Sequence, residues 1–327
     1  MSLKAAHPLD DFSLPTGGVI LKSADGIEFK AYKNILALVS PLFHDMFTLP
    51  RANESNDKEH WGKENAVPAA DEQVIDISES SSTIDTLLRL LYPISPPSFP
   101  GISESGKVTD AQELVNGVGP VLAAALKYDM QIAVEKLCTK LLDAAETTFP
   151  DGSVIDETLA LRVFVLACRL NLKEIARRAA YTSLKGSIIG VFIEDLRQIS
   201  AAQYLRLLQF HTKMADTVKT LVNEYRSFSS LGLACTSCGE GSPFSPRTAK
   251  WVLDFVARSQ PIISQSPAGH KILTREFIGD TLRVASLCHS SECQRAPAKW
   301  DVLANEIRQR IDIVIADPEN DIDLSEI

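Results

Sequence analysis

Residues 19–47 read VILKSADGIEFKAYKNILALVSPLFHDMF, and this stretch decides the fold of the first half of the chain. It begins with two short segments of alternating apolar and polar residues, 19–23 and 27–31, which flank Asp25 and Gly26. A period of two is typical of half-buried strands, and an Asp-Gly pair supplies the positive φ that a tight turn needs. The pattern predicts a β-hairpin.

Two short helices are predicted after the hairpin. Ser40 followed by Pro41 is typical of a helix start, because serine caps free backbone N–H groups and proline fits the first helical position. The apolar residues around this pair recur at short spacing: Ile35, Leu36, Leu38, Val39, Leu42, Phe43, Met46 and Phe47. A hairpin and two such helices are not stable alone, so we expect later elements to pack against them.

Those later elements extend to about residue 146. Residues 74–77 predict a third strand, and the spacing of Ser82 and Asp85 predicts the start of a helix. Another helical region starts at Asp110. We expect it to break at three residues that disfavour helix, namely Gly117, Gly119 and Pro120.

These motifs resemble those of BTB/POZ domains, most closely those of a large group of fungal BTB proteins. The resemblance lies in DGIEFKAYKNILALVSPLFHDMF (25–47), MFTLP (46–50), LLYP (90–93) and ALKYDM (125–130). It implies a BTB/POZ domain over residues 10–148, in which a small sheet is flanked by helices. Such a domain is a protein-interaction module and not an enzyme.

The resemblance also implies a homodimer with a two-fold interface. It places four residues of the second helix in or under that interface: Leu42, Phe43, Met46 and Phe47. From the residues alone, the alternative is that these side chains form the core of a monomer, because most apolar helix positions are buried.

Adaptor function in cullin-type ubiquitin ligases is a second function that the resemblance implies. Such adaptors carry a hydrophobic-x-Glu triplet shortly after the second helix, and residues 49–54 (LPRANE) depart from it. Gly18 and Tyr32 stand where the family usually has aspartate and histidine. Residues 50–72 are polar and without periodicity, which predicts a surface loop. The resemblance therefore suggests a cullin scaffold as a partner, without the triplet that would specify it.

Beyond residue 150 the chain is predicted to be almost wholly helical. Residues 158–170 and 172–184 predict a helical hairpin turned at Asn171, and Ser200 with Gln203 forms a capping box. Paired helices after a BTB domain resemble a BACK region, which we assign to residues 149–230. The predicted fold class is therefore α+β, mostly α, with BACK-like helical hairpins and a C-terminal helical region.

The C-terminal helical region is predicted to span residues 231–327. Ser245-Pro246 predicts a helix start, and a proline-containing linker is expected at residues 261–267 before a helix at 271–287. A final helix carries apolar residues at a/d-like spacing: Trp300, Leu303, Ile307 and Ile311.

Four cysteines of this region form a CxxC…CxxxxC pattern: Cys235, Cys238, Cys288 and Cys293. Two thiolates separated by two residues can bind one tetrahedral ion, and the glycine after Cys238 permits a tight turn. His289 is a substitute ligand. One structural zinc ion, unliganded thiols and a redox-active CxxC remain open, although thioredoxin-type chemistry uses a βαβ context that is not predicted here. Cys138 and Cys168 are predicted to be core residues.

Composition narrows the class of protein. The net charge of −9 argues against binding to nucleic acid, which requires clustered Lys and Arg. We recognise neither a secretory signal nor an apolar run of about 20 residues in the sequence. We therefore expect no membrane-spanning segment. Six cysteines in a chain of this size suggest a reducing compartment, and hence the cytoplasm or nucleus.

No catalytic motif is recognised in the sequence, neither a Gly-x-Ser-x-Gly elbow nor a His-Glu-x-x-His pair nor a glycine-rich phosphate loop. The predicted function is protein binding, with self-association through the BTB domain and capture of an unknown protein by the helical half. The alternative is a metal- or redox-responsive regulatory protein that acts through the cysteine cluster.

Overall fold

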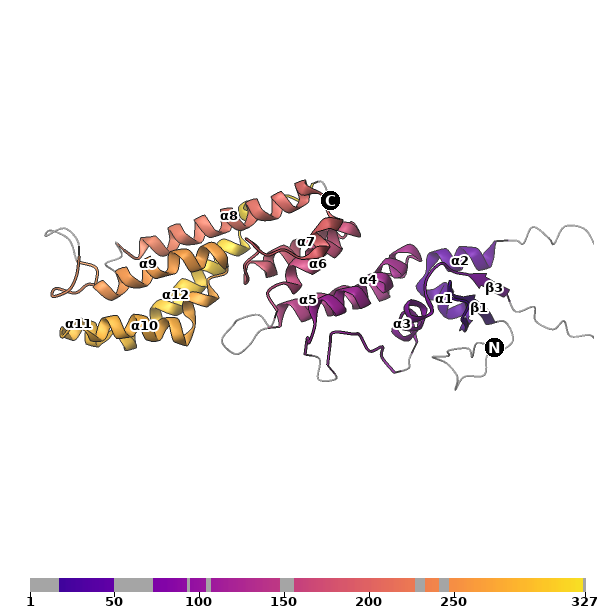
Figure 1. The fold of residues 1–327 in the computed structure, drawn as a ribbon, viewed down its shortest axis with the longest axis horizontal. Helices are drawn as coiled ribbons and strands as arrows, with labels where there is room; N and C mark the ends of the chain where they lie inside the picture. The colour runs from indigo at the N-terminus through magenta and orange to yellow at the C-terminus, as the bar shows by residue number, and fades with distance from the viewer. Residues whose placement is uncertain are drawn as a thin grey trace, which may run out of the picture. The chain divides into compact units, whose positions relative to one another are not determined.

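The computed structural model describes residues 18–49, 73–92, 95–103, 107–147, 156–226, 233–240 and 247–325 (Figure 1). The chain divides into two compact units, Met1–Leu141 and Leu142–Ile327. The division falls inside helix α5 (Gln131–Glu146). The predicted division into three domains stays a prediction.

A three-stranded sheet organises the first unit. Strands β1 (Gly18–Lys22) and β2 (Glu28–Tyr32) form the predicted antiparallel hairpin, and Gly26 in its turn has a φ of +82°. Strand β3 (Gln73–Asp76) pairs with β1 in parallel, so the strand order is β2-β1-β3. One face of the hairpin is buried through four apolar side chains: Val19, Leu21, Phe29 and Ala31.

Helices α1 (Lys33–Val39) and α2 (Pro41–Thr48) follow the hairpin as predicted. The Ser40 side chain accepts a hydrogen bond from the backbone N–H of Phe43 at 3.1 Å and donates to the carbonyl of Tyr128 at 2.5 Å. The helix cap therefore also connects α2 to the end of α4 (Ala111–Lys127), 88 residues further along the chain.

Helix α3 (Ser81–Leu91) begins earlier than the sequence predicts. Its N-cap is Ser80, whose hydroxyl accepts from the N–H of Thr83, so the start predicted at Ser82 is wrong. Asp25 in the hairpin turn accepts the backbone N–H of Ser81 at 2.8 Å and its hydroxyl at 2.5 Å. The hydrogen bond from the Ser81 hydroxyl is the main reason that the pKa of Asp25 is lowered to about 2.

Helix α4 (Ala111–Lys127) is continuous, so the break predicted at three residues is wrong: Gly117, Gly119 and Pro120. A Cβ atom at Gly117 would lie 2.5 Å from Cγ of Pro100, so the glycine lets the preceding segment approach the helix closely. Pro120 lacks one helical donor, but the helix around it is held by a fully packed face. That face consists of Leu114, Val118, Val121, Leu122, Ala124 and Ala125.

In the second unit, the predicted helical hairpin follows the end of α5. Helices α6 (Leu159–Arg169) and α7 (Lys173–Ser183) are joined through Asn171, which has a φ of +57°. A 3₁₀ turn (Glu194–Gln198) leads to α8 (Ala201–Glu224), which begins with the predicted capping box of Ser200 and Gln203.

The remaining elements complete an all-helical unit. They are α9 (Lys250–Gln265), a 3₁₀ turn (His270–Leu273), α10 (Arg275–Ser286), α11 (Ser291–Gln294), α12 (Ala296–Ala316) and a 3₁₀ turn (Pro318–Asn320). Helix α9 continues through Pro261 and ends at Gln265. The part of the predicted linker between residues 261 and 265 is therefore wrong. The helix begins at Lys250, while Ser245 and Pro246 lie outside the described residues.

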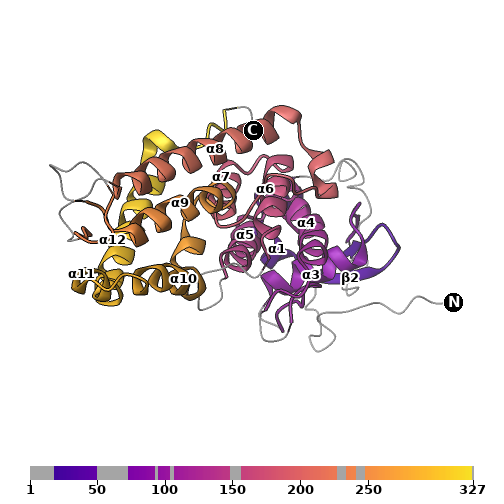
Figure 2. The same ribbon diagram turned by 60° about the vertical axis from the view of Figure 1, so that its left-hand side comes forward.

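Helices α8 and α9 lie side by side in both views (Figures 1 and 2) and share a core with α10 and α12. Trp251 and Phe255 of α9 pack edge to face against Trp300 of α12, with ring centroids 6.5 and 5.1 Å away. The apolar stripe predicted for the last helix is confirmed, because all four residues are buried: Trp300, Leu303, Ile307 and Ile311.

The fold class is confirmed at the level of a mostly helical α+β protein with a small sheet. Among the described residues, none of the helices is long and apolar enough to cross a lipid bilayer.

Candidate metal centre

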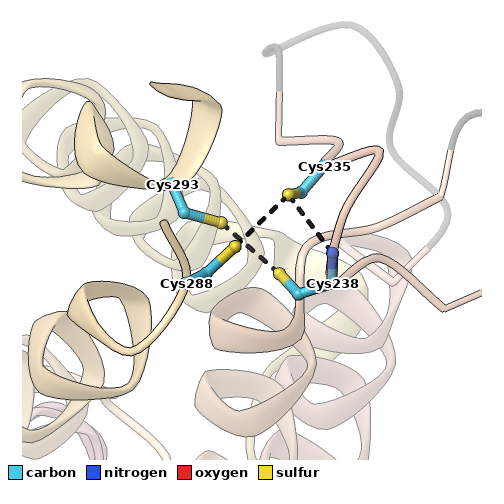
Figure 3. A group of neighbouring side chains, drawn as sticks. All are labelled: Cys235, Cys238, Cys288 and Cys293. Carbon is cyan, nitrogen blue, oxygen red and sulfur yellow. Dashed lines mark hydrogen bonds between the residues drawn. The ribbon is translucent and has the colours of Figure 1, made fainter. Parts of the chain in front are cut away.

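Four cysteines that are far apart in the sequence meet at one end of the α9–α12 region (Figure 3). Cys235 and Cys238 come from the loop before α9, whereas Cys288 and Cys293 come from the turn between α10 and α11 and from α11 itself. All four sulfur atoms lie within 4.8 Å of one another. The group predicted from the CxxC…CxxxxC pattern is therefore brought together by the fold.

The loop that carries the first pair is fixed by its backbone. The N–H of Cys235 donates to the carbonyl of Arg247 at 2.9 Å, and the N–H of Ala249 donates to the carbonyl of Leu233 at 2.9 Å. The N–H of Cys238 points at the sulfur of Cys235, 3.5 Å away, and closes the turn between the two cysteines. These contacts aim both sulfur atoms toward the same point.

Gly239 is required by the same turn. Its N–H donates to the carbonyl of Cys235 at 3.0 Å. A Cβ atom at this position would lie 2.2 Å from that carbonyl oxygen and 2.5 Å from Cβ of Arg247. No larger residue fits without moving the backbone that positions Cys235.

The second pair is positioned by helix ends. The N–H of Cys288 donates to the carbonyl of Ala285 at the end of α10, and the side chain of Gln294 donates to the carbonyl of Cys288 at 2.8 Å. Ser290 caps α11, in which Cys293 is buried.

Glu292 joins the two halves of the site. One of its oxygen atoms, Oε2, accepts from the N–H of Thr236 at 3.0 Å, from the Thr236 hydroxyl at 3.2 Å and from the Ser290 hydroxyl at 2.9 Å. The N–H of Thr236 is the main reason that the pKa of Glu292 is lowered. Glu292 was not predicted from the sequence, because an acidic residue beside a cysteine indicates no function until the loop from residue 233 packs against it.

Two of the six distances between sulfur atoms are close to those of a tetrahedral metal site. Cys235 and Cys288 are 3.8 Å apart, and Cys238 and Cys293 are 3.5 Å apart. Four sulfur atoms bound at about 2.3 Å to one ion would be separated by about 3.8 Å. A disulfide bond requires a distance of about 2.05 Å between its sulfur atoms, so all four cysteines are free thiols. The four side chains can hold one metal ion.

The thiols differ in how readily they ionise. Burial opposes ionisation of Cys235, but the N–H of Cys238 and the Ser290 hydroxyl outweigh it and lower its pKa to about 7. Burial raises the pKa of Cys238 and of Cys293. Four crowded thiolates repel one another, so a bound cation is what would allow all of them to ionise together.

The remaining predicted site residues lie elsewhere. His289 is exposed and does not join the four sulfur atoms. Cys138 and Cys168 are buried in separate helices, as predicted, and burial raises their pKa values to about 11 and about 12.

The predicted dimer residues are distributed between surface and core. Leu42 is 45% exposed, Met46 and Phe47 are half-buried, and Phe43 is buried. The Phe43 ring stacks on Phe47 and Tyr128 with centroid distances of 5.8 and 5.4 Å. Their role in a dimer stays a prediction, as does cullin binding, because residues 50–54 lie outside the described part of the chain.

No family model matches the chain, and a search of curated proteins finds no match either.

Proposed function

We propose that this protein is a non-enzymatic interaction protein, with a BTB/POZ-type docking unit and one structural Zn²⁺ ion. The ion is held by Cys235, Cys238, Cys288 and Cys293. The observation that carries the zinc assignment is the convergence of four sulfur atoms within 4.8 Å from two separate segments.

Zinc is the metal that this donor set favours. Tetrahedral sites made only of thiolates suit Zn²⁺ or iron, whereas Mg²⁺ and Ca²⁺ prefer oxygen ligands. With all four positions taken by protein, the ion has no place for water or substrate, so its role is structural. It would connect the loop before α9 to the α10–α11 turn and so stabilise the core that includes Cys235 and Cys293.

The docking function rests on the first unit. The order of hairpin, two short helices, third strand and further helices agrees with what the resemblance to BTB/POZ domains implies. Three leucines are exposed: Leu38 of α1 by 84%, Leu42 of α2 by 45% and Leu49, directly after α2, by 68%. Exposed leucines on two adjacent helices can contact another protein, and we assign these three residues to self-association.

Metal analysis of the full chain, purified under reducing conditions, tests the zinc assignment. We expect one zinc per chain, lost in the variants Cys235→Ser and Cys293→Ser and retained in Cys138→Ala. Cys138 is the matched control because it is a buried cysteine of the other unit.

A metal-free protein whose four thiols titrate as free would contradict the proposal. Disulfides in the purified protein would instead favour the redox-responsive alternative. The 3.8 and 3.5 Å contacts indicate which pairs would form, Cys235 with Cys288 and Cys238 with Cys293.

A further inference from the structure

Residues 317–325, which we name the strap, leave the end of α12 and lie along α7 and α8. The strap has the sequence DPENDIDLS, with acidic residues at 317, 319, 321 and 323. Its middle part is extended, since Asp321 has φ −63° and ψ 155°. Neighbouring side chains therefore point in different directions.

Asp321 binds to α7. Its carboxylate accepts from both Nε and the terminal nitrogen of Arg177, the former at 3.0 Å, in a bidentate ion pair. The Tyr181 hydroxyl donates to the same carboxylate at 3.0 Å. This arrangement recognises the planar shape of a carboxylate as well as its charge.

Asp323 and the strap backbone bind to α8. Arg206 pairs with the Asp323 carboxylate and donates to the Ser325 hydroxyl at 3.2 Å. Lys213 donates to the carbonyl oxygen of Glu319. Between the two aspartates, Ile322 is only 6% exposed. The surface that α7 and α8 present to the strap therefore binds one buried aliphatic side chain that is flanked by two carboxylates.

Two cavities border the strap. One of about 440 Å³ is lined by Leu205, Gln209 and Phe210 of α8 together with residues 321–323. Another of about 470 Å³ lies beside Arg177, Tyr181 and Ile315. Leu205 is 52% exposed in the wall of the first. Open space therefore borders the strap on α8 and between α7 and α12.

We propose that the surface of α7 and α8 under the strap, which we name the groove, is a docking site for an extended acidic peptide of a partner protein, with an aliphatic residue between two acidic ones. The strap occupies the groove as a built-in competitor. Its ion pairs are partly exposed, with exposed side-chain fractions of 41% for Arg177 and 23% for Asp321, and of 21% for Arg206 and 66% for Asp323. A peptide that offers the same carboxylates can therefore reach these arginines and displace the strap. The inference rests on the proposed interaction function, for which it names the class of partner.

Fluorescence anisotropy with the full chain and a labelled DPENDIDLS peptide tests this inference. We expect weak binding to the wild type, because the strap competes. The variant Asp321→Asn/Ile322→Ala/Asp323→Asn should bind at least about ten-fold more tightly, the factor expected if the strap is closed in nine of ten molecules. Adding Arg177→Gln to this variant should remove the gain, whereas adding Lys219→Gln, on α8 outside the groove, should leave it.

A peptide with asparagine in place of the two aspartates beside isoleucine should not bind. If circular dichroism shows that the triple variant loses helix, Asp323→Asn alone serves, since it changes the most exposed contact. A folded variant that binds the peptide no better than the wild type overturns the inference. Missing zinc or a monomeric mass would overturn the proposed function instead, so the two failures are distinguishable.

Discussion

At the scale of single residues, Gly239 shows how the backbone prepares the metal centre. The turn after Cys238 brings the carbonyl of Cys235 so close that a Cβ atom would lie 2.2 Å from it. Gly279 in α10 is the opposite case, because nothing lies within 4 Å of a Cβ atom there. The two glycines therefore allow a matched comparison.

Gly239→Ala should destabilise the second unit by about 1–3 kcal/mol and lower its zinc affinity, because the added methyl group displaces the Cys235 backbone. Gly279→Ala should stabilise it by about 0.5–1 kcal/mol through helix propensity. Urea unfolding monitored by tryptophan fluorescence, with metal content measured in parallel, checks both. Equal effects of the two substitutions would contradict the geometry assigned to the turn.

Some features of the site could be predicted from single residues and others could not. The CxxC spacing and the following glycine are local signals, and both pointed to Cys235, Cys238 and a tight turn. Cys288 and Cys293 were assigned to the same site because they form a second closely spaced pair and bring the number of cysteines to the four that a tetrahedral ion needs. Glu292 has its role only through contacts with Thr236, which is 56 residues away, so no local pattern could identify it.

At the scale of secondary-structure elements, α7 and α8 pack around a buried histidine. The Ser183 hydroxyl donates to the carbonyl of Ala180 at 2.7 Å, so it accepts from Nε2 of His211, 2.8 Å away. Burial lowers the pKa of His211 to about 4 from 6.5. The pair belongs to the core between the helices, since His211 is only 3% exposed.

Acid should destabilise the second unit through His211. As the pH falls below 6.5, the unfolded chain binds a proton that the folded chain refuses until the pH reaches about 4. The loss should approach about 3 kcal/mol. Urea unfolding at pH values across this window, compared with His211→Gln, checks it: the variant keeps a donor for Ser183 but does not titrate. Equal losses in both proteins would contradict the assignment.

Two helix starts were predicted correctly, whereas α3 begins earlier than the start predicted at Ser82. Ser40-Pro41 and the Ser200–Gln203 capping box act within one turn, and both were predicted correctly. Pro120 and Pro261 were expected to end helices, yet α4 and α9 continue through them. The local cost of proline is outweighed there by tertiary burial, which a single sequence does not display.

At the scale of the whole molecule, the two units carry different functions in our proposal. The first presents exposed leucines on α1 and α2 for self-association, and the second holds the metal centre and the peptide groove. The contacts of the strap could not be predicted from the sequence, because they join residues up to 144 positions apart.

Leu42→Asp should weaken self-association at least ten-fold, about the effect of losing one interface leucine. Val302→Asp is the control, because Val302 is also an exposed aliphatic residue, at 59%, but lies on α12. Light scattering over a concentration series measures both variants. A wild-type chain that stays monomeric at the highest concentration would refute the predicted dimer.

The most direct test of the central claim is the zinc K-edge X-ray absorption spectrum of the purified full chain. Our account predicts a first coordination shell of four sulfur atoms at about 2.3 Å. A shell that contains nitrogen or oxygen neighbours, or reduced protein without zinc, would contradict it.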